Sequence, residues 1–453
     1  MKKNAQAYDL TEGVIWKKLL RFFLPIAVGT LFQQLYNTVD AMVVGKFVGT
    51  QALAAVGGSA AQVIMLTIGF FVALTGGASA VISQLAGAKR EREVSEAVHS
   101  AMAFSVVAGL VMSLIGIPLT PTILAKMQTP ADTMAESVLY LRIIFAGSVF
   151  LLLFNMASSI LRSVGDSKRP LYYLIVCCVC NILLDLFFVI VLRMGIAGVA
   201  CATVISQALS TVLVLVRLCR ADEMYKLSLS QLRIHRKVMN RMFKIGIPAG
   251  IQASMYNISN LIIQVAINTL NTAVVAGWTM AGKIDGIYCA LCSALGVAVM
   301  GFVGQNYGAG KMDRVRKTLR DSLVLSAILT FALSAFVLFT GKYGTHFFID
   351  DPEVVAYTFE ILLYFAPFYV IWTTIEVISG FLRGVGDALI PLIITAVGIC
   401  GLRLLWVALV FPTHRSIAGV TTCYPISWVL TAIALVIYYK HCKVFRETQE
   451  NLQ

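Results

Sequence analysis

Two aspartates stand inside long apolar stretches of the sequence. Asp40 lies in LFQQLYNTVDAMVVG, where Tyr36, Asn37 and Asp40 share one face of a helix, and Asp185 lies in CNILLDLFF, one helical turn after Asn181. A charged side chain near the centre of a membrane-spanning helix costs about 2.5 to 3.5 kcal/mol on insertion scales. Each aspartate is therefore predicted to have a functional role. The structural alternative is that Asp40 caps a helix kink and Asp185 bonds neighbouring helices.

Carboxylate, amide and hydroxyl oxygens in one dry site support two kinds of chemistry. Neighbouring carboxylates can share a proton, or the oxygens can surround a small hard cation such as sodium. At about 1.5 Å per residue, Asp40, Asp185 and Thr203 fall in the outer half of one group of helices, and Asn155 lies nearer mid-depth. The predicted cation-coupling residues are Asp40, Asp185, Asn181, Asn155 and Thr203. If sodium is the transported ion, Asp40 and Asp185 bind it; no resident metal or other cofactor is expected.

A second group of charges occurs later in the chain and sums to zero. It consists of Lys283, Asp285, Glu376 and Arg403. A mutually neutralising ion-pair network and a direct role in substrate binding are both open. Aromatic and methionine side chains on the helices expected to line the cleft suit flat organic cations, although core packing explains any single one of them. The predicted substrate cleft contains Gln34, Tyr36, Met255, Tyr256, Asn257, Lys283, Asp285, Glu376 and Arg403.

The composition places these residues in a membrane protein. Mean hydropathy is +0.83, and 58% of the 453 residues are hydrophobic while 13% are charged, against about 25% charged in soluble chains. Apolar runs of about 20 residues predict twelve transmembrane helices and an all-α fold. Their approximate ranges are 22–44, 52–85, 94–117, 135–161, 171–192, 197–218, 239–270, 273–307, 315–340, 354–382, 389–411 and 417–439.

The charge distribution predicts the topology. Most of the 36 Lys and Arg residues fall on the side of the two termini, which the positive-inside rule places in the cytoplasm. The net charge of +13 then reflects contact with the anionic inner leaflet, and nucleic acid is not an expected partner. The ten cysteines stand mostly in apolar helices and are expected to be small buried hydrophobes.

The sequence is duplicated. LRSVGDSKRPL at 161–171 returns as LRGVGDALIPL at 382–392, and at the same spacing SQLAGAKR at 83–90 returns as GQNYGAGK at 304–311. Near the start of each copy the spacing is longer by two positions, as from Pro25 to Pro248. Six helices in each copy predict two parallel lobes, with substrate and ion sites between or within them. The predicted domains are an N-terminal lobe (1–216), a cytoplasmic linker (217–244) and a C-terminal lobe (245–453).

These motifs resemble the multidrug and toxic compound extrusion (MATE) family over essentially the full length. The resemblance rests on the LPI proline, QQLYNTVDAMVVG, the two glutamine-containing turns and the two LR-x-VGD turns. It implies a V-shaped, two-lobed antiporter that exports amphipathic, often cationic compounds in exchange for protons or sodium. It also implies a first-lobe cation site at Asp40 and Asp185 and a hinge at Pro25. Helix 7 carries no acid, so the second-lobe cation site of another subgroup is not expected in full.

The sequence therefore predicts a cation-coupled multidrug exporter in the inner cell membrane, with both termini cytoplasmic. Protonation of Asp40 would relax its polar stripe and let helix 1 bend at Pro25. The alternative is a flippase for a lipid-linked sugar or another amphiphile, which would favour a cleft rich in arginine. An enzyme is not expected, because no nucleophile, metal or nucleotide-binding constellation stands out. The expected partners are small organic molecules and the lipid bilayer, and the expected state is a monomer.

Overall fold

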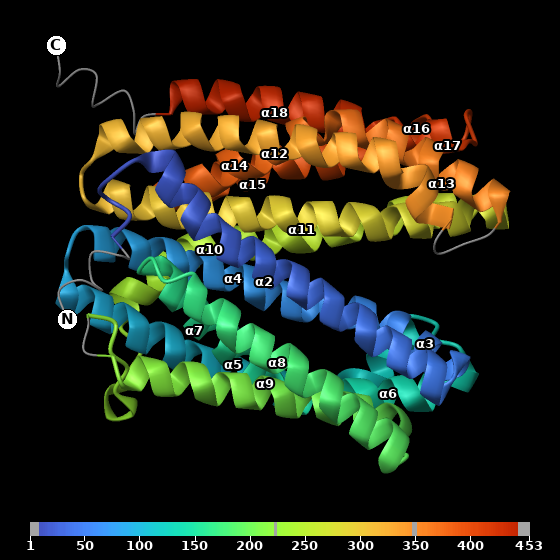
Figure 1. Cartoon of the computed structure of the whole chain (residues 1–453), viewed down its shortest axis with the longest axis horizontal. Helices are drawn as coiled ribbons and strands as arrows, with labels where there is room; N and C mark the ends of the chain where they lie inside the picture. The colour runs from blue at the N-terminus through green and yellow to red at the C-terminus, as the bar shows by residue number, and fades with distance from the viewer. Residues whose placement is uncertain (1–8, 222–223, 347–350, 443–453) are drawn as a thin grey trace.

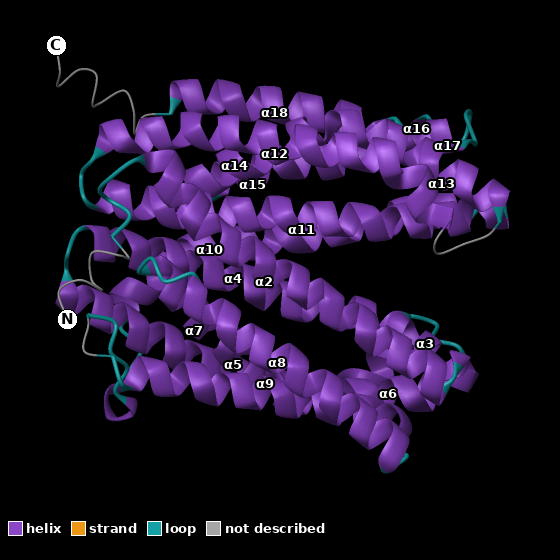
Figure 2. Ribbon diagram, in the orientation of Figure 1, coloured by secondary structure: helices purple, strands orange, loops and turns teal. Residues whose placement is uncertain are grey.

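The structure, a computed structural model, describes residues 9–221, 224–346 and 351–442. The outer ends of the two predicted lobes, 1–8 and 443–453, and residues 222–223 of the predicted linker lie outside the described residues. Every regular element among the described residues is helical, and short loops join the helices (Figure 2). The helices form two groups that run close together at one end and diverge at the other (Figure 1). The predicted all-α fold is confirmed.

The first half of the chain contains six membrane-crossing segments, here called lobe 1, and several of them are interrupted. Polar or glycine-containing breaks divide the longer runs without ending the crossing. The elements are α2 (Ile15–Val43) with the π-helical η1 (Val44–Val48), α3 (Thr50–Gly57) with α4 (Ser59–Gly87), α5 (Glu91–Lys126), α6 (Ala131–Ala146) with α7 (Ser148–Ser163), α8 (Lys168–Leu186) with the π-helical η2 (Phe187–Val191), and α9 (Gly195–Cys219).

The second half, here called lobe 2, repeats this plan after the short 3₁₀ helix η3 (Leu229–Gln231) in the linker. Its elements are α10 (Arg236–Ile267), α11 (Thr272–Gly308), α12 (Met312–His346), α13 (Pro352–Phe365) with η4 (Ala366–Phe368) and α14 (Tyr369–Val385), α15 (Leu389–Thr395) with η5 (Ala396–Gly401) and α16 (Leu402–Leu409), and α17 (Ile417–Thr421) with α18 (Cys423–His441).

Nine helical segments of the described chain are long and apolar enough to cross a membrane. The pair α6 and α7, bent by 49° at their junction, forms a tenth. The helices α2 and α10, which carry more polar side chains, complete the twelve predicted segments. The start of α2 and the end of α18 lie at the same end of the molecule (Figure 1), as an even number of crossings requires.

After the predicted helix 94–117, the sequence predicts an outer loop with Pro118, Pro121 and Pro130, and this prediction is wrong for the first two prolines, which lie inside α5. A proline removes the backbone donor that its helix would use. The carbonyl of Ile117, which Pro121 cannot reach with a hydrogen bond, instead accepts one from Nε of Arg142 at 3.4 Å. A neighbouring helix thus supplies the missing donor, which is how proline is tolerated within membrane helices.

The first helix of each lobe packs against the opposite lobe at its beginning. Helix α2 starts at Ile15, ahead of the predicted start at Phe22, and Leu19 and Phe22 pack into the hydrophobic core of lobe 2. In the same way, Met239 and Met242 at the start of α10 pack into the core of lobe 1. Farther along, α2 packs against α8 of its own lobe. The two lobes are therefore intertwined at the end where α2 begins.

That end is closed by two reciprocal glutamine contacts. Gln84 at the end of α4 donates through Nε2 to the carbonyl of Gly384 in lobe 2, at 2.9 Å. Gln305 at the end of α11 donates through Nε2 to the carbonyl of Ser163 in lobe 1, at 2.8 Å. The two glutamines are equivalent positions of the repeat, and so are the two acceptors. Each lobe therefore contributes the same bond to the other.

Glycines allow the backbones to approach at this closed end. A Cβ atom on Gly87 would overlap the backbone of Gln305, and a Cβ atom on Gly308 would overlap the backbone of Gln84. The two glycines are also repeat equivalents. Only a residue without a side chain permits this contact, so the glycines of the two repeated turns are required for closure.

The segment before α2 is tied to lobe 2 by polar contacts. The ammonium of Lys311 donates to the carbonyl of Thr11 at 3.0 Å. Burial of Asp9 favours its neutral form, but hydrogen bonds from the hydroxyl and N–H of Thr11 and the nearby charges of Lys18 and Lys311 outweigh this effect. The pKa of Asp9 is therefore lowered from its ordinary value, and its carboxylate helps to order the segment.

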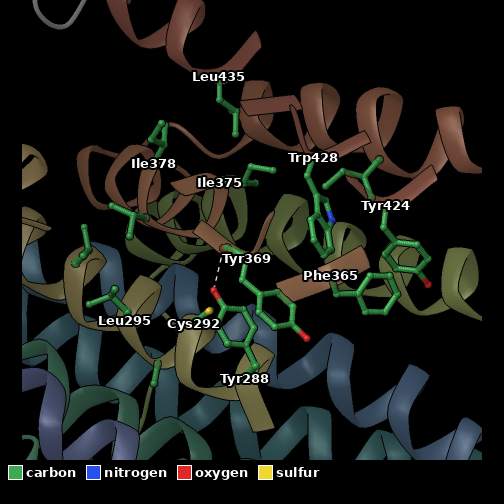
Figure 3. Close-up of a cluster of buried hydrophobic side chains, with 14 of the residues drawn as sticks. Tyr288, Cys292, Leu295, Phe365, Tyr369, Ile375, Ile378, Tyr424, Trp428 and Leu435 are labelled. Carbon is green, nitrogen blue, oxygen red and sulfur yellow. Dashed lines mark hydrogen bonds between the residues drawn. The ribbon is translucent and has the colours of Figure 1, made fainter. Parts of the chain in front are cut away.

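The core of lobe 2 is built around a pair of stacked tyrosines (Figure 3). The rings of Tyr288 and Tyr369 lie parallel with centroids 3.7 Å apart, and Phe365, Tyr424 and Trp428 surround them. The hydroxyl of Tyr288, dashed in Figure 3, donates to the carbonyl of Tyr369 at 2.8 Å. A buried phenol needs such a partner, and this bond ties α11 to α14.

Removing that hydroxyl is expected to destabilise lobe 2. Because Tyr288 is 4% exposed, Tyr288→Phe should lower the free energy of unfolding by about 1 to 2 kcal/mol, measured by SDS titration of the purified protein in mixed micelles. Tyr172→Phe is the matched control, since Tyr172 is 57% exposed and its change should stay within about 0.5 kcal/mol. Equal effects of the two substitutions would show that the buried bond contributes nothing.

Candidate functional site

The structure brings the two lobe 1 aspartates together. Asp40 lies on α2 and Asp185 on α8, and their carboxyl groups are close enough to interact directly. Asp185 and Asn181 are fully buried, and Thr203 on α9 is 5% exposed. Three helices thus supply two carboxylates, an amide and a hydroxyl to one region inside lobe 1.

The polar atoms of this site lack partners within the described part of the chain. Five buried oxygens accept or donate no hydrogen bond there: one of Asp40, both of Asp185, and those of the Asn181 amide and the Thr203 hydroxyl. Buried polar groups in native proteins are almost always satisfied. An oxygen cluster of this kind can be satisfied by an added proton, by water or by a hard cation.

Two tyrosines complete the surroundings of the aspartates. Tyr36, predicted for the substrate cleft, lies inside lobe 1 beside Thr203 and Asp40. Tyr140 on α6 interacts electrostatically with both aspartates and is 8% exposed. Tyr140 was not predicted from the sequence, because a single tyrosine in an apolar helix carries no signal of its own. A phenol hydroxyl can donate to a carboxylate, so Tyr140 belongs to the candidate site.

Asn155 and Pro25 line a different part of the lobe 1 interior. Both border a cavity of about 110 Å³ between α2, α7 and α8, on the side of the repeated LRSVGD turn. Nδ2 of Asn155 donates to the carbonyl of Leu151 at 2.9 Å. Asp40 and Asp185 do not line this cavity, whereas Tyr36 does. Pro25, the predicted hinge residue, thus borders this cavity.

The charged residues of lobe 2 are held separately. The guanidinium of Arg403, 4% exposed, donates to Oδ1 of Asn260 at 3.2 Å and lies 3.9 Å from the ring centroid of Tyr424. Oδ1 of Asp285 accepts from the hydroxyl of Tyr369 at 2.9 Å. No salt bridge within 4 Å joins any two of Lys283, Asp285, Glu376 and Arg403 in this part of the structure. Arg403 and Asp285 instead have polar or aromatic neighbours, and the charge of Arg403 also acts on Asp285.

Other residues predicted for the substrate cleft divide between the lobe interface and the lobe 2 interior. Nδ2 of Asn257 on α10 donates to the carbonyl of Met65 in lobe 1 at 3.5 Å, and Gln34 on α2 faces Gly286 on α11. Lys283 is exposed and Met255 is half-buried. The ring of Tyr256, in contrast, lies 5.6 Å from that of Trp372 within lobe 2. The interface therefore contains only part of the predicted set.

A duplicated, two-lobed helical membrane protein with two acids inside one lobe has the architecture of membrane transport proteins built from parallel repeats. The comparisons define that class further. The MatE family model matches residues 25–187 and 248–409, once in each lobe. The chain belongs to the MatE family.

Known relatives and solved structures cover nearly the whole chain. The probable multidrug resistance protein YpnP of Bacillus subtilis is 28% identical and aligns with 96% of this chain and 97% of its own length. The multidrug export protein MepA of Staphylococcus haemolyticus is 23% identical over 80% of this chain and 79% of its own. An outward-facing multidrug resistance MATE family transporter matches the fold with a TM-score of 0.90, at 20% identity, over 96% of this chain and 97% of that one.

Proposed function

We propose that this protein exports amphipathic, often cationic organic compounds in exchange for protons or sodium ions. The observation that carries the proposal is the buried cluster of unsatisfied oxygens around Asp40 and Asp185. Family membership and the multidrug resistance and export proteins among the relatives support it. The proposal assigns no catalytic step to the chain and requires no resident cofactor.

The coupling step proposed here takes place in lobe 1. A proton or a sodium ion on Asp40 and Asp185 satisfies the oxygens of Asn181 and Thr203 and neutralises the pair, which two adjacent negative charges in a dry site require. Because Asp40 lies on the same helix as Pro25, loss or gain of the cation changes the balance between straight and bent α2. Movement of α2 then alters the space available to substrate.

The closed end of the molecule is proposed to face the cytoplasm, together with both termini. In this arrangement the lobes diverge toward the outside of the inner cell membrane, and the glutamine contacts at the closed end separate substrate from the cytoplasm. Residues 1–216 and 245–453 act as the two moving lobes of one monomer, and residues 217–244 are the cytoplasmic linker. Alternating access requires the closed end to open in the next state.

The substrate is proposed to bind between the lobes, near Gln34 and Asn257, with the acids of lobe 2 favouring cations. The alternative function, a flippase for a lipid-linked sugar, depends on Lys283 and Arg403 as cleft cations. Arg403 is buried against Tyr424, which removes one of these two cations from the interface. The structure therefore favours organic cations over a pyrophosphate-linked lipid.

Transport in everted membrane vesicles tests the proposal. A proton gradient and a sodium gradient are applied in separate experiments, and a fluorescent organic cation should accumulate under at least one of them. Asp40→Asn should reduce that accumulation to background. Asp132→Asn, which changes an exposed carboxylate at the start of α6, should behave as wild type. Accumulation by Asp40→Asn at the wild-type rate would contradict the coupling site, and no transport by wild type under either gradient would favour the flippase.

A further inference from the structure

The cavity in lobe 1 contains hydrogen-bond donors that nothing else in the described residues satisfies. Nε of Arg162 and Oγ of Ser158 are buried there without a hydrogen-bond partner. Both side chains come from α7 and stand one helical turn apart, so they lie on the same face of that helix. Ser158 is 3% exposed. Arg162 as a whole is half-buried, and a guanidinium whose Nε is buried without an acceptor loses hydration that a negative charge or a strong acceptor would replace.

The second lobe shows what compensates the equivalent arginine. Arg383 occupies the same place in the second copy of the repeated turn as Arg162 does in the first. Its Nη1 donates to Oε1 of Gln252 at 3.5 Å, and Gln252 is 5% exposed. Glu376 on the same helix also interacts electrostatically with Arg383. Lobe 2 thus supplies both a neutral acceptor and an acid to its arginine.

Lobe 1 lacks both of these groups. At the spacing that relates Pro25 to Pro248, the counterpart of Gln252 is Gly29, and at the spacing that relates Arg162 to Arg383, the counterpart of Glu376 is Asn155. Gly29 and Asn155 both line the cavity. In the described residues no carboxylate oxygen lies within 4 Å of the Arg162 guanidinium. Lobe 1 therefore keeps the arginine, but it has a glycine beside a cavity where lobe 2 has the glutamine acceptor, and a neutral asparagine where lobe 2 has the glutamate.

We propose that this cavity binds one monovalent inorganic anion of the halide class, held by the Arg162 guanidinium and the Ser158 hydroxyl. A single negative charge matches the single uncompensated positive charge, whereas a dianion would leave an excess charge in a low-dielectric interior. The volume of about 110 Å³ accommodates an ion with a few waters. It is too small for an organic molecule of drug size, which needs about 300 Å³ or more.

Tyr36 borders both this cavity and the proposed coupling site, but neither Asp40 nor Asp185 lines the cavity, so the anion would contact other groups than the coupling cation. Gly29 offers a way to fill the cavity. A Cβ atom on Gly29 would make only ordinary contacts, the nearest at 3.4 Å with Leu174. Gly29→Gln should therefore fold, place an amide where lobe 2 has Gln252, and supply the acceptor that Arg162 lacks. The anion would then be displaced.

Thermal unfolding of the purified full-length protein in lipid nanodiscs tests this proposal. Sodium chloride or bromide is titrated against sodium gluconate at constant sodium concentration. Wild type should gain about 2 °C in Tm at saturating halide. Arg162→Gln and Gly29→Gln should lose this response, whereas Arg92→Gln, a change at an exposed arginine on α5, should keep it. Bromide-soaked crystals should show an anomalous peak between α2 and α7.

Three outcomes would overturn the inference. Wild type that does not respond to halide, a response of equal size in Gly29→Gln, or an anomalous peak only outside the cavity each excludes the site. Gly29→Gln keeps the test decisive if Arg162→Gln does not fold, because it leaves the arginine in place and changes only the space and the acceptor beside it.

Discussion

Gly87→Leu should open the closed end of the molecule and stop export. The new side chain would overlap the backbone of Gln305, which cannot move aside without separating the lobes. Overpacking of this kind costs about 1 to 3 kcal/mol, occasionally more, and that energy changes the ratio of two conformations about 5- to 150-fold. Positions 92 and 313 are both exposed and are equivalent in the repeat. The mean distance between spin labels at these positions should be longer in Gly87→Leu than in the protein that keeps Gly87.

Gly57→Leu is the control for this experiment. Gly57 lies on α3 in the same membrane-crossing segment, and a Cβ atom added to it would meet nothing within 4 Å. It should retain the wild-type label distance and transport rate. Gly308→Leu should reproduce the effect of Gly87→Leu, because its side chain would overlap the backbone of Gln84 in the equivalent contact of the other repeat. Unchanged label distances in both closed-end variants would show that the glycine crossing does not hold the lobes together.

Asp40→Asn and Asp185→Asn should each weaken the action of the coupling cation on the purified protein. Added cation should displace a bound fluorescent substrate from wild type, and the midpoint should rise roughly a hundredfold in either variant. The carboxylate and the bound cation form a buried pair of opposite charges; removing one partner of such a pair costs about 3 to 5 kcal/mol, and each 1.4 kcal/mol is a factor of ten. The double variant should be little worse than either single variant, because both residues act in one site.

The control for this cycle is again Asp132→Asn, which should leave the displacement midpoint unchanged. Additive effects of Asp40→Asn and Asp185→Asn would instead mean that the aspartates act at independent sites. That result would contradict the shared site while leaving the family assignment untouched, since the assignment rests on the match in both lobes.

Much of the candidate coupling site could be predicted from sequence because a charged side chain in an apolar helix is energetically costly. An acid in an apolar helix is rare, so Asp40 and Asp185 were evident, and counting residues along helices placed Thr203 at a similar depth. Tyr140 could not be found in this way. Its role depends on the position of α6 beside α2 and α8, and a tyrosine costs too little in a membrane helix to be conspicuous.

Local sequence was also a poor guide where a polar or charged group on one helix is satisfied by a residue of another helix. Prolines at positions 118 and 121 predicted a loop, but Arg142 of α6 replaces the lost donor at Ile117. The charge-neutral set in lobe 2 left both an ion-pair network and a role in substrate binding open, and among the described residues no salt bridge within 4 Å joins its members: Arg403 bonds to Asn260 and packs on Tyr424. In both cases a partner distant in sequence satisfies the group, and composition alone does not identify that partner.

Hydropathy, repeat spacing and the cost of buried charge are properties of the chain, so they were enough to predict a duplicated, twelve-segment membrane protein with an ionisable pair in lobe 1. Three other features became visible only in the folded molecule. Helices α2 and α10 begin in the opposite lobe's core, Gln84 and Gln305 close one end reciprocally, and Arg162 faces a cavity where Arg383 faces Gln252. These features depend on which faces of the helices meet, and contacts between helices far apart in sequence are set by packing.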